Sequence, residues 1–205
     1  MKTFVTPLLI CLVASSAFGV TDPEPNLMGV YFDKYATNNN LTVPANIPFD
    51  AYLILTNSTA IGINAYELGL DVVVPSGMEN MFFMLESNIA NGAVNGLNVG
   101  ENDALGGDYI VGLATPIPFQ NELILHSWKY LILTDIYVEF YIHAATNPSI
   151  PGNYPIVQNS EDSILMQTGV SGLGLGHGPD LPTAIISGVV KVEKSNFGSV
   201  KALYR

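Results

Sequence analysis

The chain has 205 residues, of which 18 are acidic and 7 are basic, so its formal net charge is −11. A protein that binds DNA, RNA or anionic lipid must neutralise phosphates with many cations, and this composition argues against all three partners. The single cysteine, Cys11, excludes a disulfide within the chain.

Residues 1–19 have the pattern of a secretory signal peptide. Lys2 supplies the positive start, and residues 4–13 form an apolar run that is too short to span a bilayer. Small residues then end the segment, as a cleavage site before Val20 requires. The alternative, a retained N-terminal anchor, is disfavoured by the short run. We therefore predict an exported protein with no membrane span after signal removal. Because small extracellular eukaryotic domains often rely on disulfides, a bacterial secreted, periplasmic or cell-surface protein is favoured.

The exported part begins with an extended leader, residues 20–26, which holds two prolines and no helix signal. The first predicted strand is residues 28–33, where valine, tyrosine and phenylalanine favour a pleated surface. Residues 35–46 are rich in asparagine and are predicted to form a loop.

The clearest strand pattern in the chain is a pair of segments around a short polar turn. Apolar side chains alternate with other residues along residues 49–55 and again along residues 64–74, which is the period of a half-buried strand. Asparagine, serine and threonine at 57–59 can turn the chain through side-chain hydrogen bonds. We therefore predict a hairpin that forms the central strand pair, with Glu67 and Asp71 on its wet face.

Further strands are predicted downstream, and turn or loop signals separate most of them. No amphipathic helix pattern appears before the C-terminal tail. The order of eight or nine short strands is typical of one antiparallel, immunoglobulin-like β-sandwich domain over residues 20–194, with a jelly roll as the competing architecture. The downstream predicted strands are residues 80–87, 108–114, 122–133, 137–143, 163–168 and 183–193. A short helix is the alternative for residues 80–87, and a helical turn is the alternative for residues 163–168. The predicted loops between them include residues 91–107, 148–155 and 169–182.

Residues 28–145 resemble cohesins and related bacterial extracellular β-sandwich domains. The matching features are Pro-Phe-Asp-Ala-Tyr-Leu-Ile-Leu at 48–55, Asn-Ala-Tyr-Glu-Leu-Gly-Leu-Asp at 64–71, Tyr-Ile-Val-Gly-Leu-Ala at 109–114, and the strand from Leu123 to Ile132. The resemblance implies a cohesin-like β-sandwich and a secreted scaffold or interaction module rather than an enzyme. No dockerin-contacting position can be matched residue by residue. The resemblance therefore extends to the fold and not to the partner.

Residues 195–205 form a basic tail, and four of the seven basic residues of the chain lie in its last 15 positions. The ending Gly-Ser-Val-Lys-Ala-Leu-Tyr-Arg, residues 198–205, resembles a short C-terminal signature of uncharacterised exported bacterial proteins. Ser195 can cap a short helix. The apolar face of that helix would consist of Phe197, Val200, Leu203 and Tyr204. The sequence leaves open whether such a helix packs on its own sandwich or serves as a tether or sorting signal.

One candidate metal site follows from the sequence. Glu101, Asp103 and Asp108 lie in a glycine- and asparagine-rich segment and supply carboxylate oxygens, which calcium prefers. Their spacing is not that of an EF-hand, and a solvated acidic loop is the alternative. The three histidines, His126, His143 and His177, lie in separate segments without zinc-site spacing. Apart from calcium, no metal or cofactor is predicted.

Four tyrosines are candidates for a ligand or partner face. Tyr137 and Tyr141 share one strand face with Glu139, and Tyr52 and Tyr66 flank the predicted sheet. Aromatic rings on a flat sheet can stack on sugars or contact a protein, whereas core packing is the alternative. No Gly-x-Ser-x-Gly turn or other catalytic constellation occurs, so no catalytic residue is predicted.

The sequence therefore predicts a non-enzymatic, exported β-sandwich module for protein interaction, adhesion or cell-surface assembly. Its expected partner is a protein or a glycan at the cell surface, and self-association is left open. A carbohydrate-binding module is the first alternative. A secreted hydrolase is the second alternative, and it would require a cleft with paired carboxylates or a metal.

Overall fold

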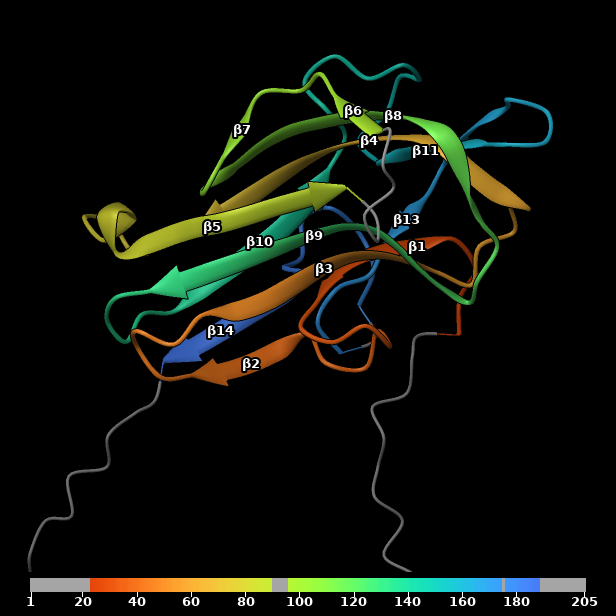
Figure 1. The fold of residues 1–205 in the computed structure, drawn as a ribbon. Coiled ribbons are helices and arrows are strands. Elements are labelled where there is room, and N and C mark those ends of the chain that lie inside the picture. The colour runs from red at the N-terminus through yellow and green to blue at the C-terminus, as the bar shows by residue number, and fades with distance from the viewer. Residues whose placement is uncertain (1–22, 90–95, 175, 189–205) are drawn as a thin grey trace, which may run out of the picture.

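The computed structural model describes residues 23–89, 96–174 and 176–188. Within these residues the chain forms fourteen β-strands and one short 3₁₀ helix, η1 (Glu79–Met81), with no α-helix. The strands make two sheets that pack face to face (Figure 1). The predicted signal peptide and the predicted C-terminal tail lie outside the described residues.

The first sheet has five strands in the order β13-β1-β3-β9-β5. Neighbouring strands are antiparallel, except that β1 and β13 run parallel. The long strand β9 lies between β3 and β5 and pairs with both. The bounds are β1 Leu27–Tyr31, β3 Phe49–Thr56, β5 Phe82–Ile89, β9 Glu122–Ile132 and β13 Gly169–Val170.

The second sheet has nine strands and is organised around β4 (Gly62–Val73). On one side, β11 pairs with the first half of β4 and β10 with the second half; on the other side, β8 pairs with most of its length. Strands β6 and β7 extend the sheet beyond β8, β12 extends it beyond β11, and β14 and the parallel β2 extend it beyond β10. The remaining bounds are β2 Asn40–Val43, β6 Gly96–Asn98, β7 Asn102–Asp103, β8 Gly106–Pro118, β10 Val138–His143, β11 Ile156–Asn159, β12 Leu165–Gln167 and β14 Ala184–Gly188.

The core lies between the two sheets and follows from the two-residue period of the strands. On β3, the side chains of Phe49, Ala51, Leu53 and Leu55 all face inward and are at most 9% exposed. Aromatic rings then join the two layers. Phe140 of the second sheet contacts rings of the first sheet, with centroid distances of 6.3 Å to Phe82 and 5.8 Å to Tyr130.

The predicted β-sandwich and most of its long strands are confirmed. Strands β5, β8, β9 and β10 overlap segments whose composition predicted strands. The sheets are mixed rather than purely antiparallel, and there are more strands than expected. Short strands within or beside the predicted loops escaped prediction, namely β2, β6, β7, β11 and β13. Each has two to four residues, so its sequence holds too few side chains to show a period, and pairing with a remote strand defines it.

The predicted central hairpin is wrong in one respect. Strands β3 and β4 follow each other in the sequence, but they lie in different sheets. Strand β3 is hydrogen-bonded to β1 on one side and β9 on the other, so it has no free edge for β4. The polar segment between them crosses from one sheet to the other and starts at Asn57, whose φ of 49° is left-handed.

Candidate functional site

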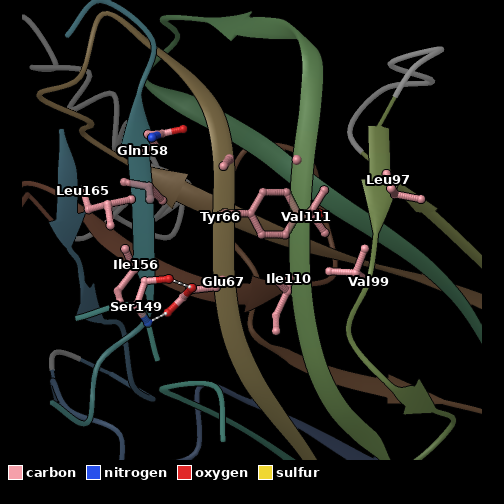
Figure 2. A pocket seen from close by; sticks show the side chains of 13 residues that line it. Tyr66, Glu67, Leu97, Val99, Ile110, Val111, Ser149, Ile156, Gln158 and Leu165 are labelled. Carbon is pink, nitrogen blue, oxygen red and sulfur yellow. Dashed lines mark hydrogen bonds between the residues drawn. The ribbon is translucent and has the colours of Figure 1, made fainter. Parts of the chain in front are cut away.

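The outer face of the second sheet is hollowed into a pocket of about 360 Å³ (Figure 2). Five neighbouring strands build it, β6, β8, β4, β11 and β12, together with the loop that precedes β11. The pocket is lined by Ala65, Tyr66, Glu67, Leu97, Val99, Ile110, Val111, Gly112, Ser149, Ile156, Val157, Gln158 and Leu165. These side chains are mostly apolar, as is usual in binding pockets.

Glu67 lies at the centre of this pocket because of the strand register. On β4 it is paired with Ile110 of β8 on one side and with Ile156 of β11 on the other. The neighbouring side chain, Tyr66, points to the opposite face and belongs to the core. The alternation along β4 thus places one carboxylate between two isoleucines on the outer face.

The segment before β11 covers the carboxylate of Glu67. The backbone N–H of Ser149 donates to Oε1 and its hydroxyl donates to Oε2, both at 2.6 Å. These two bonds are drawn in Figure 2. As a result Glu67 is only 8% exposed. The sequence predicted the correct face of β4 for Glu67, but its prediction of a wet position was wrong because this segment folds over the face.

The outer face of β4 is also covered at the next outward-facing position, Gly69. Gly69 is buried beneath the His143 ring and the Ala144 carbonyl, and a Cβ at this position would collide with both. Asp71, two residues further, is exposed and lies 3.3 Å from Nε2 of His143. The outer face of β4 therefore changes from covered to open along its length, and the wet-face prediction holds for Asp71.

The pocket combines a buried anion with an exposed apolar rim. Glu67 is the only charged residue in its lining, and no lysine, arginine or histidine among the described residues forms an ion pair with it. At the rim, Leu97 and Val99 are each 66% exposed and Leu165 is 38% exposed. A carboxylate in apolar surroundings is costly unless donors or a cation compensate it, and here Ser149 supplies donors but no charge.

The four tyrosines predicted as a ligand face do not form one surface. Tyr141 lies on the outer face of β10 and Tyr137 directly precedes this strand. Both hydroxyls donate to Glu139, at 3.0 Å from Tyr141 and 3.1 Å from Tyr137. Partial burial and this carboxylate raise the pKa of both phenols. Tyr52 belongs to the other sheet and lies under the ammonium group of Lys34. Tyr66 is 2% exposed, so its ring cannot reach a ligand in solvent.

Two of the three predicted calcium ligands accept hydrogen bonds from backbone N–H groups. The carboxylate of Asp108 accepts from the backbone N–H of Thr146, and that of Asp103 accepts from Leu105. The described residues contain no group of three or more histidine, cysteine, aspartate or glutamate side chains that could hold a metal ion. Calcium binding by Glu101, Asp103 and Asp108 stays a prediction.

The histidines are separated in space as well as in sequence. His126, on β9, is 2% exposed, and its two ring nitrogens bond to the hydroxyls of Tyr66 and Ser87. Burial lowers its pKa to about 4. His143 lies on β10 in the other sheet, so the two strands do not pair. His177 lies 3.7 Å from a carboxylate oxygen of Glu24.

Neither the pocket nor the contact between Glu67 and Ser149 was predicted from the sequence. The alternation along β4 identified Glu67 as an outward-facing carboxylate, which was the one available signal. Nothing in the sequence connected it to Ser149, which lies 82 positions away. The apolar rim was also missed, because Leu97 and Val99 fall in a segment that was predicted to be loop.

The two mixed sheets define the chain as an all-β sandwich. The sequence matches no protein-family model and no curated protein. Solved structures do match, several cohesins among them, so the fold is that of a cohesin-like β-sandwich. No helix in the described part of the chain is long and apolar enough to cross a membrane.

Three cohesins illustrate this likeness. The sixth cohesin of Acetivibrio cellulolyticus scaffoldin B has a TM-score of 0.52 and 10% identity, over 80% of this chain and 99% of the cohesin. A non-cellulosomal cohesin of Archaeoglobus fulgidus has a TM-score of 0.51 and 9% identity, over 83% and 95%. The OlpA cohesin of Clostridium thermocellum has a TM-score of 0.51 and 8% identity, over 81% and 100%. At such identities the likeness concerns the fold alone.

Proposed function

We propose that the chain is a non-enzymatic, extracellular protein-interaction module. Its partner protein binds the outer face of β6, β8, β4, β11 and β12, and the pocket around Glu67 is the centre of the contact. The observation that carries the proposal is the pocket itself, in which an apolar rim is exposed around a buried carboxylate.

Covering this face with a partner protein would be favourable, because it would bury apolar side chains that are now exposed to water. Leu97 and Val99 leave two thirds of their surface in water. Fully burying an exposed aliphatic side chain of this size contributes roughly 1.5–3 kcal/mol. A concave centre with an apolar lining is where the strongest contacts of a protein interface are usually found. The five strands supply a rigid frame, so a partner would meet a preformed surface.

The structural neighbours favour a protein over a small molecule as the partner. The Acetivibrio cellulolyticus cohesin was solved in complex with a Cel5 dockerin, and the Clostridium thermocellum cohesin in complex with another dockerin. A sandwich of this shape is thus used by other proteins as a protein-binding module. Together with the predicted signal peptide, this favours adhesion or cell-surface assembly outside the cell as the setting.

The test compares two matched substitutions of exposed leucines. Leu97→Asp places a charge on the pocket rim, and Leu85→Asp places one on β5 of the other sheet, where Leu85 is 48% exposed. The wild-type chain is used to capture extracellular proteins from the source culture. Any captured protein is purified, and its affinity for the wild type and for each variant is measured by calorimetry. We expect Leu97→Asp to weaken binding at least about tenfold and Leu85→Asp to leave it unchanged. Equal affinities for both variants, or no purified protein that binds the wild type, would refute the proposal.

A second candidate function, glycan binding, is favoured by one observation. Tyr137, which is 47% exposed, and Tyr141 hold Glu139 between their hydroxyls on an open sheet face. Aromatic rings can stack on a sugar, and a carboxylate beside them can accept hydrogen bonds from the sugar hydroxyls. Affinity electrophoresis in gels that contain soluble neutral polysaccharides tests this function. Retardation that is lost in Tyr137→Ala would support it, and equal mobility in every gel would exclude it for the polysaccharides used.

A further inference from the structure

The carboxylate of Glu67 is held in place by Ser149 and forms no ion pair with a cation among the described residues. Ser149 donates one hydrogen bond to each oxygen, which leaves further lone pairs on both oxygens. Glu67 and Ser149 both line the pocket, and Glu67 keeps 8% of its surface exposed. The site therefore has a carboxylate acceptor that two hydrogen bonds fix in position.

The surroundings of Glu67 make a positive charge the favoured complement. Ile110 and Ile156 flank it in the sheet, and these side chains cannot solvate an anion. No cation among the described residues approaches it, and the whole chain carries a net charge of −11. A covering partner would displace water from the carboxylate, and an apolar partner would leave an uncompensated buried charge.

The shape of the pocket specifies the kind of cation. Its walls are mostly aliphatic, and Leu97, Val99 and Leu165 form an exposed apolar rim. Lysine and arginine carry their charge at the end of an apolar stem, which can lie along such a wall while the head group reaches the anion. An arginine fork can bond both oxygens of a carboxylate at once.

We infer that the partner protein inserts a lysine or arginine side chain into this pocket, with its cationic head on Glu67 and its stem against the aliphatic walls. This inference rests on the proposed function and specifies the chemistry of the partner. Glu67 is then the residue that selects the partner by charge, and the apolar rim supplies contact area around it.

The test uses a phage-displayed library of random linear peptides as the probe for the full chain. Peptides are kept when they bind wild type and lose binding to Leu97→Asp, which restricts the set to the pocket face. We expect the retained peptides to share an arginine or lysine. A retained set without a shared cation would overturn the inference and leave the proposed function standing. If no peptide is retained, the proposed function fails as well.

A double-mutant cycle then locates the cation. The shared arginine is replaced by citrulline, which has nearly the same shape and no charge, and each peptide is measured on wild type and on Glu67→Gln. We expect the replacement to weaken binding to wild type at least about tenfold and to have little effect on Glu67→Gln. Equal losses on both proteins would place the cation elsewhere and overturn the inference.

Two controls separate charge recognition from loop structure and from self-association. Ser149→Ala removes one hydrogen bond but keeps the carboxylate, so it should retain the preference for arginine over citrulline that Glu67→Gln loses. Loss of this preference in both variants would indicate a structural role of Glu67 instead. Sedimentation of the full chain tests whether a second copy of the chain occupies the pocket. Concentration-dependent self-association that Glu67→Gln abolishes would place a second copy in the pocket and overturn the inference.

Discussion

The Nδ1 atom of His126 lies 2.9 Å from the hydroxyl oxygen of Tyr66, in the core between the two sheets. That hydroxyl donates its only proton to the carbonyl of Leu125, at 3.0 Å. The imidazole must therefore carry its proton on Nδ1 and donate it to Tyr66. Its Nε2 is then left to accept from the hydroxyl of Ser87, at 2.8 Å. The neutral ring thus has a hydrogen-bond partner at each nitrogen. Protonation of Nε2 would remove its acceptor lone pair, so the Ser87 hydroxyl could no longer donate to it and would have to rotate its hydrogen away.

We predict that this histidine makes stability depend on pH. Burial lowers its pKa from 6.5 to about 4, so the unfolded chain binds the proton first as the pH falls. The stability contributed by the neutral ring is full above about pH 6.5 and is lost progressively down to about pH 4. Between pH 7 and pH 5 the free energy of unfolding should fall by about 2 kcal/mol, which urea titrations at both pH values measure.

His126→Gln is the control for this dependence. Glutamine can donate and accept hydrogen bonds but does not titrate, so the variant should be less stable at pH 7 and should lose most of the dependence between pH 7 and pH 5. A variant with the slope of the wild type would assign the effect to other groups.

A second prediction concerns two buried tyrosine hydroxyls that differ in their partners. Tyr109 accepts a hydrogen bond from Nε1 of Trp128 at 2.9 Å, whereas the hydroxyl of Tyr130 has no partner among the described residues. Tyr109→Phe should lower the free energy of unfolding by about 1–3 kcal/mol, because it leaves the indole N–H unpaired in the core. Tyr130→Phe removes a group that is already unpaired and should be neutral or stabilising. Trp128 is the only tryptophan, so its fluorescence follows both denaturant titrations. Equal losses in the two variants would contradict this account.

A third prediction compares two adjacent phenylalanines on β5. Phe82 points into the core and is 2% exposed, and Phe83 points outward and is 41% exposed. Phe82→Ala should cost about 3–5 kcal/mol of stability, because it leaves a cavity against Tyr130 and Phe140. Phe83→Ala should cost less than about 1 kcal/mol, since its surface is largely in water already. Chemical denaturation of both variants checks the difference, and a large loss in Phe83→Ala would mean that a further element covers the outer face.

A fourth prediction compares two glycines on neighbouring strands. Gly69 on β4 lies under the His143 ring and the Ala144 carbonyl, while Gly112 on β8 has open space where a Cβ would be. Gly69→Ala should destabilise the chain by about 1–3 kcal/mol because the covering segment must move. Gly112→Ala should stay within about 0.5 kcal/mol of the wild type. Thermal unfolding distinguishes the two variants. Unchanged stability in Gly69→Ala would show that His143 and Ala144 can move away from β4 at little energetic cost.

The sequence by itself determined the class of the fold and the inward or outward direction of many side chains. The two-residue period of a strand fixes which residues share a face, so the buried row of β3 and the outward direction of Glu67 and Asp71 could be read from local composition. The acidic balance and the missing cysteines after the predicted signal peptide also needed no structure.

Only the tertiary structure decided which sheet each strand joined and what covered each face. Strands β3 and β4 separate into two sheets because remote strands occupy both edges of β3. Glu67 is buried because Ser149, 82 positions away, folds over it, while Asp71 on the same strand stays open. Periodicity is a local property of the chain, whereas pairing and covering depend on contacts between segments that are far apart in the sequence. The pocket around Glu67 is the product of such contacts.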